Sequence, residues 1–274
     1  MKLDLNAAWE SAVKLVRKNR EMILVLAGVF FFLPYVVFAL FVPMDGFASA
    51  AETGESGAMM VSFNAFVADY WWAVLLLSLV QTIGGTAIMA VIGDPARPTV
   101  NDAMTRGLSL LPSQVGAQIA ISVAFLIIII LAIMLGSLGG SRTLATTFAI
   151  FSLPALLYLG ARLSLSSPTI AIERRINPIA AITGSWRLTR GNGLRLFSFY
   201  LLLLVAFLVV GQVLALVISL LTALPGAELA KILDAILSGL LNATFAVIIY
   251  AVLAAVHRQL AQAARVRSSD DETP

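Results

Sequence analysis

Long apolar runs alternate with short polar segments along the whole chain. A helix needs about 20 apolar residues to cross the hydrocarbon core of a bilayer. Six runs reach that length: Met22–Pro43, Tyr70–Gly93, Val115–Gly136, Thr143–Ser166, Leu196–Ala223 and Ala235–Val256. The pattern therefore predicts six transmembrane helices. The fifth run is the longest, so its helix is expected to tilt or to lie partly among the headgroups.

Composition supports the same class. Of the 274 residues, 60% are hydrophobic and only 12% are charged, whereas soluble domains carry about 25% charged residues. We predict an all-α integral membrane domain over residues 1–265 and a disordered acidic tail over 266–274. The "ASA" at Ala48–Ala50 resembles a signal-peptide cleavage site, but the preceding apolar run exceeds the roughly 7–15 residues of a signal peptide's apolar region. An uncleaved first helix is favoured.

Basic residues gather on one side of the predicted membrane. With the N-terminus inside, 16 of the 18 Lys and Arg residues are cytoplasmic, and only Arg142 and Lys231 lie outside. Cytoplasmic loops are enriched in Lys and Arg. The distribution predicts that both termini are cytoplasmic. The first outer loop, Met44–Asp69, has no Lys or Arg and is rich in Gly, Ala and Ser, so it is expected to be mobile.

A short basic segment precedes each odd-numbered span. "AAWESAVKLVRKNREMIL", from Ala7, aligns with "AAITGSWRLTRGNGLRLF", from Ala180, so that Asn19 meets Asn192. A fainter copy, "RPTVNDAMTRGLSLLPSQV", begins at Arg97. We predict three helical hairpins, each preceded by a cytoplasmic interfacial amphipathic helix, in repeats near 1–93, 97–166 and 176–256. Chance similarity of short Ala/Arg-rich strings is the alternative.

These segments have the pattern of helices that lie in the headgroup plane. Apolar residues recur at helical spacing, Trp belongs at that depth, and cations reach lipid phosphates. The candidate headgroup or partner contacts, which we call the basic collar, are Trp9, Lys14, Arg17, Arg162, Glu173, Arg174, Arg175, Trp186, Arg187 and Arg190. The collar is expected to bind anionic lipid or a protein partner. The alternative is that Lys and Arg only set the topology.

One stretch carries a family resemblance. An Arg near the end of the fourth span is followed by "SSPTIAIE" (Ser166–Glu173), a basic gap and "PIAAITGSWRLTRG" (Pro178–Gly191). This resembles the six-helix membrane domain of bacterial glycerophosphoryl diester phosphodiesterases and related stand-alone inner-membrane proteins of unassigned function. The resemblance implies a bacterial cytoplasmic-membrane scaffold. It carries over no hydrolase residue, because the soluble hydrolase barrel has no counterpart in the sequence.

Few polar groups lie inside the predicted spans. Arg162 is the only charged residue there, and it either snorkels to the headgroups or pairs with Glu173 or a lipid phosphate. The amides Gln81, Gln212 and Asn242 lie deeper. Such amides are expected to form hydrogen bonds between helices. The competing interpretation is that they line a polar path for a substrate. Ser167–Pro168 is expected to break the fourth helix.

Catalytic chemistry has little support in the sequence. There is no cysteine, and the single histidine, His257, has no second ligand at metal-binding spacing. We therefore expect no catalytic residue, no cofactor and no metal, and an interfacial or solvated place for His257. Motifs for nucleotide binding, serine hydrolysis and zinc proteolysis are all missing.

Three functions compete. The first is a non-catalytic membrane protein that binds or organises phospholipid, or a partner protein, through the basic collar. The second is a small transporter or lipid-flipping conduit with a polar path between its helices. A membrane-embedded enzyme is the least supported. The expected partners are anionic membrane lipid and either a membrane-protein partner or a second copy of the chain. Nucleic acid is not expected, since the net charge is only +3.

Overall fold

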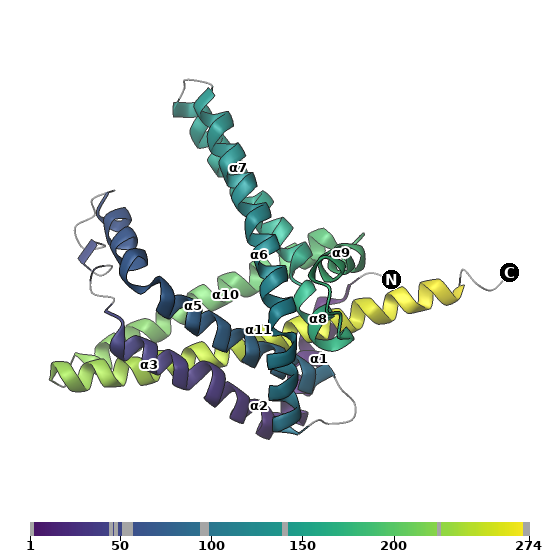
Figure 1. Cartoon of the computed structure of the whole chain (residues 1–274), viewed down its shortest axis with the longest axis horizontal. Coiled ribbons are helices and arrows are strands. Elements are labelled where there is room, and N and C mark those ends of the chain that lie inside the picture. The colour runs from purple at the N-terminus through teal and green to yellow at the C-terminus, as the bar shows by residue number, and fades with distance from the viewer. Residues whose placement is uncertain are drawn as a thin grey trace.

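The computed structural model describes residues 3–43, 46, 49–50, 57–93, 99–138, 142–223 and 226–270. Within these ranges the chain is entirely helical, without a strand (Figure 1). The elements are α1 (Leu5–Lys18), α2 (Arg20–Ala27), the π-helix η1 (Gly28–Phe32), α3 (Leu33–Phe41), α5 (Ala58–Gly93), α6 (Val100–Leu138), α7 (Arg142–Leu163), α8 (Ser166–Glu173), α9 (Pro178–Leu188), α10 (Gly193–Thr222) and α11 (Ala227–Asp270).

Six segments among the described residues are long and apolar enough to cross a membrane. They are Arg20–Phe41, Ala58–Gly93, Val100–Gly136, Ser152–Glu173, Gly193–Thr222 and Glu228–Val266. The predicted all-helical class and the six candidate spans are confirmed, which is the architecture of a multi-pass membrane protein. The helical backbone satisfies its own hydrogen bonds, as a chain in hydrocarbon must.

The first span is helical throughout but changes its winding. α2, η1 and α3 follow one another without an intervening loop, and the π-helical turn spans Gly28–Phe32. Pro34 lies two residues after this turn and has no N–H to donate to the helical ladder. The wider turn before Pro34 is the local accommodation of that missing donor.

Three helices, α5, α6 and α11, extend well beyond the apolar runs predicted for their spans. α5 begins at Ala58, so the second half of the predicted mobile loop Met44–Asp69 is helical instead; residues 44–45, 47–48 and 51–56 lie outside the described part of the chain. α6 begins at Val100, where Thr99 Oγ1 accepts from the Asp102 N–H at 3.2 Å and Asp102 Oδ2 accepts from the Thr99 N–H at 3.0 Å. This reciprocal cap starts the helix. A separate interfacial helix before the third span is therefore wrong.

The fourth span is interrupted, but not where predicted. α7 ends at Leu163 and α8 begins at Ser166, so the break falls at Ser164–Leu165 rather than at Ser167–Pro168. Pro168 instead lies in the first turn of α8. That position suits proline, because the first N–H groups of a helix have no intrahelical acceptor.

Two short helices, α1 and α9, precede the first and fifth spans. Their N-termini are capped by Asp4 Oδ1 and Asn177 Oδ1, which accept from backbone N–H groups at 3.1 and 2.9 Å. Each is joined to the next helix by a buried asparagine in a similar backbone conformation. Asn19 has φ −116° and ψ 22°, and Asn192 has φ −122° and ψ 6°. Each of the two residues that the sequence alignment paired lies directly before the following helix, although four residues separate α9 from α10 and only Asn19 separates α1 from α2.

α11 is the central element (Figure 1). It packs against α1, α2, η1, α3, α5, α8, α9 and α10. Its buried face carries Ala251, Ala254 and Ala255, whose small side chains let neighbouring helices approach closely. α11 continues to Asp270, so the first part of the predicted disordered tail, 266–270, is helical instead, and 271–274 lie outside the described residues.

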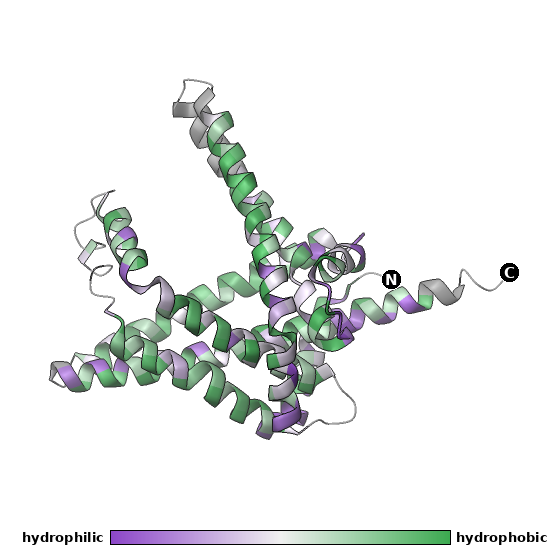
Figure 2. Ribbon diagram, viewed as in Figure 1, coloured by the Kyte–Doolittle hydropathy of each residue, from purple (hydrophilic) through white to green (hydrophobic). Residues whose placement is uncertain are grey.

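The C-terminal part of α6 and its neighbour α7 extend away from the other helices (Figure 1). Figure 2 shows that this arm is predominantly hydrophobic along its length. Apolar side chains such as Ile127, Ile130 and Ile133 are exposed on α6. In a bilayer, this surface is suited to contact with lipid chains.

Candidate functional site

Arg162, at the C-terminal end of α7, lies against α9. Its guanidinium carbon is 3.6 Å from the centroid of the Trp186 ring, a cation–π contact. Its Nη2 donates to the Trp186 carbonyl at 2.9 Å, and its Nε donates to Thr189 Oγ1 at 3.2 Å. Ser185 Oγ in turn donates to the Arg162 carbonyl at 2.7 Å. Arg162 therefore holds the end of α7 to α9. Of the alternatives considered for it, the ion pair with Glu173 is not formed, because both Glu173 oxygens have other partners.

Glu173, the last residue of α8, has two other partners. Its Oε1 lies 3.0 Å from Nε2 of His257 on α11, and its Oε2 accepts from Arg175 Nε at 2.8 Å. His257 is only 2% exposed, so a solvated place for it is wrong. Its Nδ1 is buried without a hydrogen-bond partner. The carboxylate thus connects the end of α8 to the middle of a long helix.

The N-terminus of the chain is attached to the junction after α9. The Leu3 N–H donates to Asn192 Oδ1 at 2.9 Å, and Arg195 Nη1 donates to the Leu3 carbonyl at 3.4 Å. Both α1 and α9 also pack against α11. These contacts bring the first and third basic segments of the sequence to the same end of the molecule, where α8 and α9 also pack against each other.

The remaining collar residues are on the surface at this end. Trp9 and Trp186 are each 43% exposed. Lys14 Nζ lies 3.7 Å from Glu10 Oε2, an exposed pair one helical turn apart. Four other cations of the basic collar are exposed and form no ion pair with a described residue: Arg17, Arg174, Arg187 and Arg190. Arg174 ends α8 in the left-handed conformation, with φ 54°.

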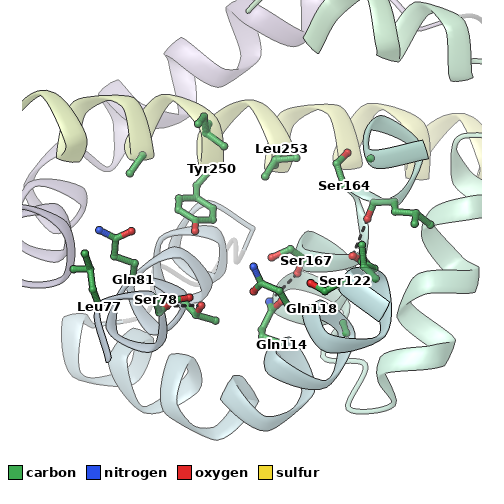
Figure 3. A pocket seen from close by; sticks show the side chains of 18 of the residues that line it. Leu77, Ser78, Gln81, Gln114, Gln118, Ser122, Ser164, Ser167, Tyr250 and Leu253 are labelled. Carbon is green, nitrogen blue, oxygen red and sulfur yellow. Dashed lines mark hydrogen bonds between the residues drawn. The ribbon is translucent and has the colours of Figure 1, made fainter. Parts of the chain in front are cut away.

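A cavity of about 740 Å³ lies between α5, α6, α8 and α11. Figure 3 shows Gln81 from α5 and Gln118 from α6 on one side of it, with Tyr250 and Leu253 reaching in from α11. Aromatic and aliphatic side chains complete the wall. Many lining residues are exposed, including Val74 and Ile249, so the cavity opens on the surface of the bundle.

Two of the three intramembrane amides predicted from the sequence line this cavity. Gln81 faces it, and Asn242 lines it while donating from Nδ2 to the Phe31 carbonyl of η1 at 3.3 Å. The third, Gln212 on α10, is exposed and does not line it. The inter-helix hydrogen bond predicted for these amides is found for Asn242, but not for Gln81 or Gln212 among the described residues. The structure therefore brings together Gln81 and Asn242 and leaves Gln212 apart.

Sequence reasoning missed most of the polar lining. Gln114 Nε2 donates to the Ser167 carbonyl at 3.1 Å and so joins α6 to α8. Gln114, Gln118 and Ser122 follow one another at four-residue intervals and therefore lie on one face of α6. That spacing was readable. Gln114 was assigned to the interfacial segment before Val115, whereas Gln118 and Ser122 lie inside the predicted third span and were overlooked there.

Comparison with known proteins adds no relative. The chain matches no protein-family model, no curated protein and no solved structure. The resemblance to the membrane domain of glycerophosphoryl diester phosphodiesterases therefore stays a prediction. Within the described ranges, no three His, Asp or Glu side chains gather as a metal site would require.

Proposed function

We propose that this chain is a non-catalytic, multi-pass protein of the bacterial cytoplasmic membrane that binds anionic phospholipid through the basic collar. Both termini and the collar would face the cytoplasm. A membrane-protein partner or a second copy of the chain could be organised on the same surface. One observation carries the proposal: the Leu3–Asn192 hydrogen bond, 2.9 Å long, ties together two basic segments that are far apart in the sequence.

The collar offers cations that the protein itself does not neutralise. Arg174, Arg187 and Arg190 form no ion pair with a described residue. Guanidinium groups bind phosphate in a two-pronged geometry, and each basic residue near an anionic surface contributes about 1 kcal/mol. Arg162 contributes to the same surface. It donates from Nε and from Nη2 to α9, and its remaining N–H groups are available to a lipid phosphate.

The two short helices have the character of interfacial helices. α1 buries Ala8 and Ala12 and exposes Trp9, while α9 buries Ala181 and exposes Ile179 and Trp186. Exposed Trp beside cations is typical of helices that lie at the headgroup level. We infer that α1 and α9 lie flat at the cytoplasmic boundary, each in front of a helical hairpin. The hairpin arrangement and the orientation belong to this proposal.

The experiment compares lipid retention by matched variants. The full chain is purified in mild detergent with a mixture of phosphatidylglycerol and phosphatidylcholine, and the retained lipids are quantified by mass spectrometry. Replacing Arg187 and Arg190 together by Gln removes two unpaired surface charges. We expect phosphatidylglycerol affinity to fall roughly tenfold or more, with phosphatidylcholine unchanged, since each charge contributes about 1 kcal/mol.

Two further variants separate binding from folding. Lys231→Gln removes one exposed charge from the other end of α11 and is expected to leave retention unchanged. Arg174→Gly removes a collar charge while relieving the left-handed backbone at φ 54°. It should weaken phosphatidylglycerol retention without lowering the melting temperature. Equal retention by the wild type and the Arg187→Gln/Arg190→Gln variant would overturn the proposal.

A lipid-flipping or transport conduit is the second candidate. The observation that favours it is the cavity of about 740 Å³ that reaches both Gln81 and Asn242. A conduit would move fluorescent phospholipid between leaflets of proteoliposomes, which dithionite quenching measures. Dithionite reaches only the lipid in the outer leaflet. If it quenches the same fraction of the fluorescence in liposomes with and without the protein, no lipid has moved between leaflets and this candidate is excluded.

A further inference from the structure

The cavity between α5, α6, α8 and α11 is lined by uncharged side chains. Lys, Arg, His, Asp and Glu are missing from its lining, yet hydroxyl and amide groups are frequent there. Several of these polar side chains form no hydrogen bond with another described residue: Ser78, Gln81, Gln118, Ser122, Ser167 and Tyr250. The lining therefore combines a mainly apolar wall with neutral polar side chains, six of which have no hydrogen-bond partner among the described residues.

Unpaired amides at this place need a partner. Each of the Gln81 and Gln118 amides offers two donor hydrogens and one acceptor oxygen. They lie on helices that are long and apolar enough to cross a membrane. Hydrocarbon cannot satisfy them, so a molecule that supplies both donors and acceptors is favoured over a lipid chain in the same space.

The lining also selects against charge. A phosphate or ammonium group in this cavity would lose its hydration without gaining a counter-ion, because no charged residue lines the wall. A hydroxyl group both donates and accepts and therefore matches Ser, Tyr and Gln side chains without that cost. Apolar lining residues such as Phe31, Phe125 and Phe245 are suited to an acyl chain.

Size and access fit a lipid. The volume of about 740 Å³ lies within the range of roughly 300–1,000 Å³ that is usual for small-molecule sites. Gln118 and Ser122 are exposed on α6, and Val74 and Ile249 are exposed on the two neighbouring helices. A lipid in the surrounding bilayer could therefore reach the polar groups sideways, without crossing an aqueous surface.

We propose that this cavity is a binding site for a lipid with an uncharged, hydroxyl-bearing headgroup, of which diacylglycerol and a monoglycosyl diacylglycerol are the two nearest chemical forms. The hydroxyl groups of the lipid bond to Gln81 and Gln118, and its acyl chains leave between α5 and α6. The site is separate from the basic collar, which would take phosphate.

The test uses the full chain in mixed micelles. Its melting temperature is measured against the mole fraction of dioctanoylglycerol, of its monoglucosyl derivative, of dioctanoyl phosphatidylglycerol and of free glycerol. We expect the two uncharged lipids to raise the melting temperature, and the mole fraction for half the effect to rise at least fivefold in a Gln81→Leu/Gln118→Leu variant. The stronger of the two responses tells which headgroup the site prefers.

The matched control is Gln212→Leu, which removes an exposed amide from α10 that does not line the cavity. It should respond to the uncharged lipids as the wild type does. Gln118→Leu alone serves if the double variant does not fold, because Gln118 is exposed and without a described partner. Equal responses of Gln118→Leu and Gln212→Leu would overturn the site.

Two more results decide the chemistry. If free glycerol raises the melting temperature as strongly as the lipids do, the site does not require an acyl chain and the proposed lipid ligand is overturned. If Gln81→Leu/Gln118→Leu weakens the rise in melting temperature caused by phosphatidylglycerol, the preference for an uncharged headgroup is overturned. The proposed function fails independently. Arg187→Gln/Arg190→Gln should lower phosphatidylglycerol retention and leave the response to dioctanoylglycerol unchanged.

Discussion

Glu173 Oε1 and His257 Nε2 lie 3.0 Å apart, although the two residues are separated by 84 positions in the chain. The contact connects the last residue of α8 to α11, the helix around which the bundle is packed. Arg175 completes the cluster with a 2.8 Å contact to the other carboxylate oxygen. The chain's one histidine is thus part of the attachment between two helices.

Removing Glu173 should therefore destabilise the fold. Glu173→Ala leaves both ring nitrogens of His257 without a partner, since Nδ1 already has none. We expect a loss of about 1–3 kcal/mol in the free energy of unfolding, and a smaller loss for Glu173→Gln, which keeps an acceptor oxygen. Unfolding of the purified protein in detergent measures both.

A matched carboxylate tests whether this loss is specific. Glu10 belongs to an exposed pair with Lys14, at 3.7 Å and with side chains 68% and 78% exposed. Exposed pairs contribute about 0–1 kcal/mol, so Glu10→Gln should change little. Similar losses for Glu173→Ala and Glu10→Gln would contradict the role given to Glu173.

Arg162 should be needed to hold α9 in place. Lysine keeps the charge but lacks the planar fork that stacks on Trp186 while donating to its carbonyl and to Thr189. Arg162→Lys is expected to increase hydrogen exchange of the α9 amides several-fold. The control is Arg187→Lys, an exposed change on the same helix, which should leave exchange as in the wild type. Unaltered protection in Arg162→Lys would contradict this attachment.

The crossing of α5 and α6 depends on Gly107. A Cβ atom at this position would lie 2.6 Å from the Ile83 carbonyl oxygen, which is backbone and cannot rotate away. Gly107→Ala should therefore separate the two helices and destabilise the protein by about 1–3 kcal/mol.

Gly28 is the matched control for that change. A Cβ atom there meets nothing within 4 Å, and the residue has helical angles of φ −60° and ψ −49°. Gly28→Ala should be neutral or stabilising by up to about 1 kcal/mol. Both variants can be compared by denaturant titration in detergent. If Gly107→Ala proves as stable as Gly28→Ala, the close crossing is not required.

The orientation can be mapped directly because the chain has no cysteine. Single cysteines at Glu10, Arg187 and Glu228 occupy exposed positions. With an impermeant maleimide on spheroplasts, we expect Glu228→Cys to be labelled in intact cells, and Glu10→Cys and Arg187→Cys only after permeabilisation. Labelling of Glu10→Cys in intact spheroplasts would reverse the proposed topology.

Local pattern was enough for some features and misleading for others. The six spans were found because run length and apolar content are properties of each segment alone. The starts of α5 and α6 were missed because polar residues such as Asn64, Asp69 and Asp102 do not stop a helix that extends beyond the hydrocarbon. Apolarity marks the membrane-crossing part of a helix, whereas caps mark its ends.

The helical class and the six candidate spans follow from the amino-acid sequence alone, because a backbone in hydrocarbon must satisfy its hydrogen bonds within each segment. The three-dimensional packing of the helices set which polar side chains meet. It paired His257 with Glu173, placed Arg162 on Trp186, gathered Gln81, Gln118 and Asn242 around one cavity and left Gln212 outside. Those relationships depend on helix rotation and crossing, which are set by small residues and side-chain packing between distant segments.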